Sequence, residues 1–322
     1  MKLKSITLLL LAEIMAMSLW FVSAAILPDM VREADLSPFR QAALSSGVQA
    51  GFVIGALASA IFGLADRFDP RRVFAISAIC AGLANAVLLI TEPGSSIAIM
   101  ARVLTGALLA GVYPVGMKIA VGWGDKDRGF LVGALVGALT LGSAAPHLIA
   151  LGGGSDWQLT VIIASSAAIL AGFVCLLISL GPHHTIAPKF NPKTIASAWT
   201  NKRVRLAYAG YLGHMWELYA MWAWVAAATT VSYSVTLPAS EAEWLSKLTA
   251  FIAIGAGGIT CLFAGKLADR IGKAEVTIIA MALSGTAALA TAATFGGPVW
   301  LTFTIVVIWG AYSGHTLPGI PK

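Results

Sequence analysis

The sequence GLADRFDPRR occupies residues 63–72, and a related sequence, GKLADRIGK, occupies residues 265–273. The shared tetrapeptide Leu-Ala-Asp-Arg begins at Leu64 in the first copy and at Leu267 in the second, an offset of 203 positions. Each copy follows a long apolar stretch. A charged motif that recurs in the same context predicts a chain built from two related halves.

Further residues repeat at nearly the same offset, which becomes 204 positions elsewhere in the chain. Their agreement to within one residue covers most of the length that the two copies share. The pairs are Glu13 and Glu217, Met17 and Met221, Trp20 and Trp224, Gly106 and Gly310, and Pro114 and Pro318. We therefore predict tandem copies of one helical unit.

The composition places these copies in a membrane. Of 322 residues, 58% are hydrophobic and 11% are charged, whereas ordinary soluble domains have about 25% charged residues. A spanning helix needs about 20 mainly apolar residues. Ten such stretches, numbered helices 1 to 10 in chain order, lie near 5–27, 42–65, 73–91, 96–120, 129–151, 158–180, 204–231, 245–265, 275–295 and 299–318. The fold class is therefore an all-α membrane protein.

Basic residues set the expected orientation. With the N-terminus inside, 17 of the 21 Lys and Arg residues fall on the inner side and three, Arg32, Arg40 and Lys247, on the outer side. This bias follows the positive-inside rule and accounts for the net charge of +6 without nucleic acid. We expect an integral protein of a bacterial inner membrane with both termini cytoplasmic. The first stretch is interpreted as a helix because its apolar run is longer than that of a signal peptide.

Three segments follow from this pattern: an N-terminal six-helix bundle (1–180), a cytoplasmic linker (181–203) and a C-terminal bundle (204–322). The copies are separated by an even number of spans, so they insert in the same orientation, as parallel repeats do. The loops at 63–72 and 265–273 resemble the G-x-L-A-D-R-x-G-R/K signature of the major facilitator superfamily. The pair Arg102 and Gly106 is similar to the family's arginine motif in helix 4.

This resemblance implies a fold of two six-helix parallel repeats, of which the second lacks its last two helices, giving about ten of twelve. The counterparts of residues 129–180 would lie near 333–384, beyond Lys322. A ten-helix architecture, a truncated gene product and an incomplete sequence all fit this pattern. We favour truncation.

Ionisable residues within the spans are the candidate site residues, because a charge in the middle of a membrane needs a compensating role. On helix 7, His214, Glu217, Met221 and Trp224 share one stripe at helical spacing. A carboxylate one turn from an imidazole can pass a proton. The alternative is that both groups only hydrogen-bond to neighbouring helices.

Equivalent and neighbouring positions complete this set. Glu13 and Trp20 occupy the corresponding places in helix 1, and in the resembling family helices 1 and 7 line the central cavity. The resemblance links Arg102 to proton coupling or anion binding, although Arg102 is also able to form a structural ion pair with Glu13. Tyr113 follows Arg102 on its stripe, and His147 in helix 5 is the remaining candidate for substrate binding or proton coupling.

The repeated loops are predicted to control conformation. By the resemblance, Asp66, Arg67, Asp269 and Arg270 are gating residues that bind helix ends of the opposite half. In the family, Asp269 would face helix 5, and Asp66 would face helix 11, which this sequence does not contain.

The expected function is secondary active transport of a small polar or charged solute by alternating access, coupled to protons. The expected partners are the solute, protons and membrane lipid, with the protein as a monomer. The alternative is a truncated or degenerate protein of the same fold that does not transport. No phosphate-binding loop or catalytic motif indicates an enzyme, and no spacing of Cys or His predicts a metal or cofactor site.

Overall fold

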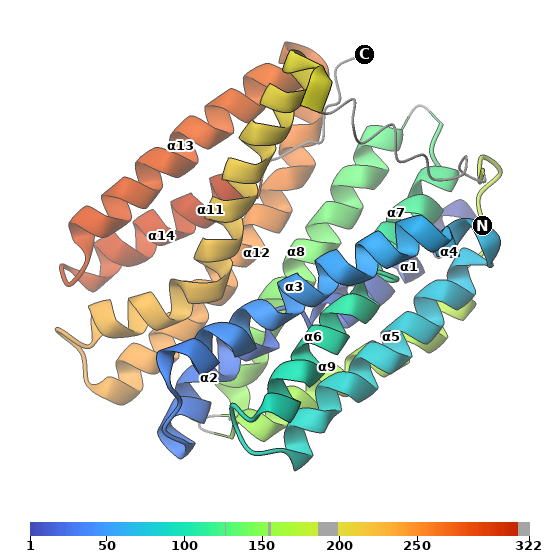
Figure 1. The fold of residues 1–322 in the computed structure, drawn as a ribbon. Helices are drawn as coiled ribbons and strands as arrows, with labels where there is room; N and C mark the ends of the chain where they lie inside the picture. The colour runs from blue at the N-terminus through green and yellow to red at the C-terminus, as the bar shows by residue number, and fades with distance from the viewer. Residues whose placement is uncertain (126, 154–155, 186–198, 315–322) are drawn as a thin grey trace.

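The structure is a computed structural model that describes residues 1–125, 127–153, 156–185 and 199–314, and most of these residues are helical (Figure 1). Its helices in chain order are α1 (Lys2–Met17), α2 (Val22–Glu33), α3 (Pro38–Phe62), α4 (Leu64–Arg67), α5 (Pro70–Ala86), η1 (Val87–Ile90), α6 (Ser96–Leu109), α7 (Tyr113–Gly122), α8 (Arg128–Gly153), α9 (Trp157–Leu176), α11 (Lys202–Tyr233), α12 (Ala239–Ile271), α13 (Lys273–Thr294) and α14 (Val299–Ser313). Each of the ten predicted stretches contains helix. The centre of the predicted linker, 186–198, lies outside the described residues.

Eight segments of the described chain are long and apolar enough to cross a membrane. Two of them, Lys2–Glu33 and Ser96–Gly122, consist of two α-helices in succession, and a third, Pro70–Ile90, consists of α5 and η1. Of the other two predicted spans, α14 is apolar but has only 15 described residues. The helix α11 has 32 residues but is less apolar, because it is rich in Trp and Tyr and contains His214 and Glu217.

Local sequence explains where several helices begin. Short polar side chains at the N-cap accept a hydrogen bond from a backbone N–H of the first turn, which has no partner within the helix. Proline follows the cap at Pro38 and Pro70, where its missing N–H costs nothing. The capping residues are Ser37, Asp69, Ser95, Asp156 and Asn201.

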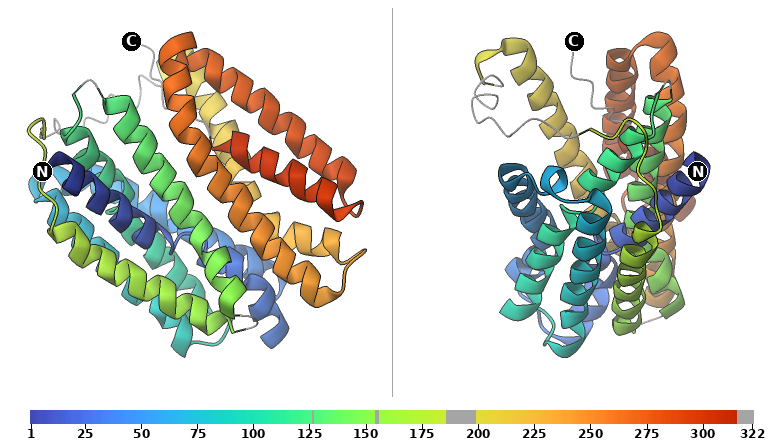
Figure 2. Two further views of the ribbon diagram at one scale, coloured as in Figure 1. Left: turned by 180° about the vertical axis from the view of Figure 1, so that it is seen from behind. Right: turned by 90° about the vertical axis from the view of Figure 1, so that its right-hand side faces the viewer.

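The helices form two groups that lie side by side, α1 to α9 and α11 to α14 (Figures 1 and 2). The most extensive contact between the groups is that of α8 with α12, and α2 also contacts α11. At Gly137 and Gly258 these helices approach closely: a Cβ added to either residue would lie about 3 Å from the carbonyl oxygen of the other. Small residues of α8 and α12 therefore lie at the boundary between the halves.

Packing within each half confirms the repeat. A Cβ added to Gly106 of α6 would lie 1.9 Å from the carbonyl oxygen of Val48 in α3. Its counterpart Gly310 in α14 stands in the same relation to Ala253 of α12, at 2.2 Å. Because only glycine permits such an approach, both copies use it to bring their fourth span against their second. These spans are α6 and α3 in the first half and α14 and α12 in the second.

The copies differ in their first helix. The N-terminal copy is interrupted between Met17 and Val22, whereas α11 runs without a break through the equivalent positions. A second interruption separates α6 from α7. There, Pro114 has no N–H to donate to the carbonyl of Ala110, so the helical hydrogen bonding stops.

Candidate functional site

Aromatic side chains from both halves meet at the boundary between them. Trp20 and Phe21 lie in the break between α1 and α2, Phe52 lies on α3, and Tyr219 and Trp222 lie on α11. The ring centroid of Trp20 lies 4.7 Å from that of Phe52 and 6.1 Å from that of Tyr219. The rings of Trp20 and Tyr219 are nearly parallel. Phe21 contacts Trp222 edge-on at 5.5 Å. We call these five residues the central aromatic cluster.

Buried polar atoms of this region lack hydrogen-bond partners among the described residues. They include the indole N–H groups of Trp20 and Trp222 and the hydroxyl of Ser23. The helix α8, which packs against α1 and α2, contributes the hydroxyl of Ser143 and both ring nitrogens of His147. Buried polar groups are nearly always bonded in folded proteins. This boundary is therefore the candidate site for a polar molecule.

Arg102 does not form the ion pair with Glu13 that the sequence left open. It is fully buried, and its guanidinium donates to the backbone carbonyls of Leu19, at 2.8 Å, and Trp20, at 3.2 Å. A third hydrogen bond joins it to the side-chain oxygen of Asn85. Leu19 and Trp20 lie in the break of the first helix, so Arg102 takes up carbonyls that the helix has released.

The second half has no equivalent of this arrangement. The position that corresponds to Arg102 is Val306, which is buried on α14. In the N-terminal half, Asn85 is in turn bound by its amide to the hydroxyl of Ser165 at 2.9 Å, which links α5 to α9. The arginine is present in only one copy, and that copy is the one whose first helix is broken.

Glu13 is fully buried on α1 and points into the N-terminal half. Neither oxygen of its carboxyl group has a hydrogen-bond partner in the described part of the chain. A Cβ added to Gly116 of α7 would lie 2.7 Å from this carboxyl group, so the glycine leaves the room that it occupies. Tyr113 begins α7 one turn earlier and is partly buried against the core.

Glu217 has a different environment on α11. Its Oε1 accepts hydrogen bonds from the hydroxyl of Ser284 on α13 and from the indole N–H of Trp309 on α14, the latter at 2.8 Å. Glu217 thus binds helices of its own half, as in the alternative interpretation of the sequence. His214 is buried, and its ring nitrogens have no partner among the described residues. Trp224, with 42% of its surface exposed, does not join the central aromatic cluster.

The predicted gating loop of the first half forms contacts within that half. Asp66 is bound to the ammonium group of Lys118 in α7, and the same ammonium donates to the carbonyl of Ala65 at 2.8 Å. Arg67 is exposed. In the second half, the side chain of Asp269 lies outside the described residues.

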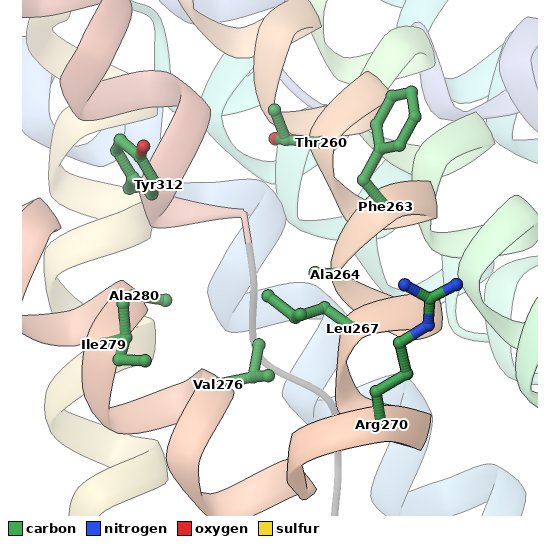
Figure 3. Close-up of a pocket in the computed structure, with 9 residues that line it drawn as sticks. All are labelled: Thr260, Phe263, Ala264, Leu267, Arg270, Val276, Ile279, Ala280 and Tyr312. Atoms are coloured by element: carbon green, nitrogen blue, oxygen red, sulfur yellow. The ribbon is translucent and has the colours of Figure 1, made fainter.

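Arg270 lies at a cavity of about 460 Å³ between α12, α13 and α14 (Figure 3). Thr260, Phe263, Ala264, Leu267, Val276, Ile279, Ala280 and Tyr312 are the other lining residues. Apart from Thr260, Arg270 and Tyr312, the lining is aliphatic or aromatic. This cavity lies within the second half and does not include any residue of the central aromatic cluster.

Four charged residues that the sequence did not select form a closed ring between α2 and α12. The ammonium group of Lys247 is 3.1 Å from Asp29 and 2.9 Å from Glu243. The guanidinium of Arg32 binds Asp29 and Glu243 in turn. We call these residues the charge ring. The spacings Asp29 to Arg32 and Glu243 to Lys247, one helical turn each, were the signal available in the sequence.

A family model described as Major Facilitator Superfamily matches residues 9–321. The chain belongs to this superfamily. Its fold is that of a major facilitator protein with two parallel repeats, of which the second has four helices in the described residues. The family consists of membrane transporters. No curated protein sequence matches this chain significantly.

Solved structures of major facilitator proteins share this fold. The xylose transporter XylE from E. coli, in a partially occluded inward open conformation, superimposes with a TM-score of 0.62 at 14% identity over 97% of this chain and 85% of that one. The nucleoside transporter NupG, as its D323A mutant, gives a TM-score of 0.67 at 13% identity over 96% and 80% of the two chains. Identities this low establish the fold alone.

Proposed function

We propose that this protein is a secondary active transporter that moves a small polar solute by alternating access, with transport coupled to protons. The supporting observation is the central aromatic cluster, to which both halves contribute. A site made by two bodies changes its access when one body moves against the other. We further propose that the N- and C-termini are cytoplasmic in a bacterial inner membrane, because most basic residues then lie inside.

The residues at the boundary favour a ring-shaped solute with hydroxyl or carbonyl groups. Binding sites for small molecules combine aromatic walls with a few well-placed polar groups. Here Trp20 and Trp222 supply ring faces and N–H donors, and His147 and Ser143 supply further polar atoms. XylE and NupG transport xylose and nucleosides according to their descriptions, and both solutes are of this kind.

Binding is tested by the intrinsic tryptophan fluorescence of the purified protein during titration with D-xylose and with uridine. Trp222→Phe keeps an aromatic ring and removes one donor. A lost hydrogen bond of about 0.5–1.5 kcal/mol weakens binding by about 2- to 13-fold. Trp224→Phe is the matched control, because this exposed side chain lies outside the cluster. Equal effects of the two substitutions would contradict the assignment of Trp222.

The same titration separates transport from the alternative function. Saturable binding of either solute, followed by its uptake into proteoliposomes, supports a transporter. If neither solute binds, and a wider panel of sugars, nucleosides and carboxylates also gives no saturable signal, the non-transporting alternative is favoured.

Glu13 is the residue that we propose for proton coupling. A carboxylate that is buried without a partner is costly in its charged form, so its proton can be exchanged when the conformation changes its surroundings. Glu217, which accepts two hydrogen bonds, and His214 are further candidates on α11.

Proton movement is measured with a pH-sensitive dye inside proteoliposomes after addition of D-xylose or uridine, whichever binds. Glu13→Gln should abolish solute-dependent proton uptake but preserve the exchange of labelled for unlabelled solute, which needs no net proton movement. Glu275→Gln is the control, because Glu275 is an exposed carboxylate near the start of α13. Undiminished proton uptake by Glu13→Gln would exclude Glu13 as the coupling residue.

A further inference from the structure

The four residues of the charge ring can form their pairs in only one alignment of α2 with α12. Asp29 pairs with Lys247, and Arg32 pairs with Glu243. The residue numbers rise along α2 as they fall along α12, so the helices run in opposite directions. Each helix presents one acid and one base, and a shift by one turn would place like charges together.

Burial divides the ring into an inner and an outer pair. The side chains of Asp29 and Lys247 are only 3% and 6% exposed, whereas that of Arg32 is 52% exposed. Buried charges are stable only when they are paired with good geometry, and removing one partner leaves a costly unpaired charge. Each charge of this ring touches two of opposite sign, so the four together are neutral.

The contact between α2 and α12 is made by side chains. The principal helix contacts of α2 are with α3, α8, α9 and α11, and it reaches α12 mainly through the ring. In Figure 1, the end of α2 and the start of α12 lie on the same side of the molecule, away from the N-terminus. A link made by long side chains can separate without disrupting the packing of either helix.

We propose that the charge ring is a latch between the two halves: it closes the end of the protein opposite the N-terminus and separates when that end opens. This inference rests on the alternating access proposed above, and it assigns the closed end to four named residues. On the proposed orientation, the latched end is the outer one. The state described here is then closed to the outside.

Distances between spin labels test the latch without any solute. Asp35→Cys and Ser240→Cys place labels at exposed positions beside the ring, in protein whose Cys80, Cys175 and Cys261 are replaced by alanine. Pulsed electron resonance in lipid nanodiscs then reports the distance between α2 and α12. We expect one short distance in the otherwise unchanged protein.

The combined substitution Asp29→Asn and Lys247→Met removes the inner pair without leaving an unpaired charge at either position. It should increase the ratio of long to short distances about tenfold or more. Arg32→Gln, at an exposed side chain, should shift the same ratio in the same direction by a smaller factor. Asp127→Asn is the control, because the pair of Asp127 with Lys2 lies within one half.

Exchange of all four charges, Asp29→Lys, Arg32→Glu, Glu243→Arg and Lys247→Asp, restores the alternation and should return the short distance. An unchanged distance distribution in both Asp29→Asn/Lys247→Met and Arg32→Gln would overturn the latch. Because no solute is present, this result is independent of whether D-xylose or uridine is transported. A working latch with no solute uptake would instead count against the proposed function.

Discussion

Replacing Arg102 by methionine tests whether this side chain holds the break in the first helix. The guanidinium donates to the carbonyls of Leu19 and Trp20 and to Asn85. Methionine is long enough to fill much of the same space, but it donates no hydrogen bond. The substitution therefore removes three hydrogen bonds with little loss of apolar packing.

The size of the effect follows from these bonds. A buried acceptor left without a partner costs about 1–3 kcal/mol, so three acceptors set an upper limit of about 9 kcal/mol. The variant also no longer buries a charge, which offsets part of this cost. If the segment straightens, the carbonyls of Leu19 and Trp20 can accept from the N–H groups of Ser23 and Ala24. We expect a net loss of about 3 kcal/mol in the free energy of unfolding.

Equilibrium unfolding in detergent, followed by circular dichroism, measures this loss. Arg102→Lys should be intermediate, because one ammonium group cannot reproduce the planar fork of a guanidinium. Arg270→Met is the control, since it removes an exposed arginine that makes no described hydrogen bond or ion pair. If Arg102→Met is as stable as the unchanged protein, or if lysine fully replaces arginine, the break does not depend on Arg102 as we infer.

Two further predictions concern packing and pH. Gly106→Ala places a Cβ 1.9 Å from the carbonyl oxygen of Val48 and should lower the free energy of unfolding by about 2 kcal/mol. Gly129→Ala, whose added Cβ has nothing within 4 Å, should be nearly neutral in the same assay. Equal losses of stability in the two variants would contradict the packing argument. Asp69→Ala should cost about 1 kcal/mol as a lost helix cap, and Asp69→Asn should cost only a few tenths, because asparagine also caps. Hydrogen bonding to Arg71 holds the pKa of Asp69 below its ordinary value of 3.8, so the contribution of the charge is complete above about pH 4 and is lost as the pH falls through the lowered pKa. The stability difference between Asp69→Asn and the unchanged protein should therefore shrink as the pH is lowered from 7 to 3. A constant difference would refute the contribution of the Asp69 charge.

The repeat and the helices were predictable because both depend on sequence order and periodicity. The offset that related Gly106 to Gly310 also relates the backbone segments against which these glycines pack. The break in the first helix was not predictable from its own residues. We attribute it to Arg102, which lies on another helix and binds backbone atoms that would be satisfied in a continuous helix.

The sequence also did not predict which neighbouring helices each face of α11 contacts. Helical spacing correctly placed His214 and Glu217 one turn apart, but it does not show which neighbours they meet. In the structure Glu217 binds Ser284 and Trp309 of its own half, whereas Tyr219, two residues later, meets Trp20 of the other half. The roles in transport of these residues, and of Asp269 and Arg270, stay predictions.

The contact between Arg102 and the first helix has a consequence for biogenesis. The first helix is synthesised and inserted about 80 residues before Arg102 enters the membrane, so the carbonyls of Leu19 and Trp20 have no guanidinium to bind at that time. We expect the newly inserted helix to be straight and to bend only when the fourth span arrives. A charged arginine costs about 2.5–3.5 kcal/mol to place at the centre of a membrane helix, and the carbonyls of the bend compensate that cost. We therefore expect assembly of the N-terminal half to include a late exchange of backbone partners, which the C-terminal half, with valine at the equivalent position, does not require.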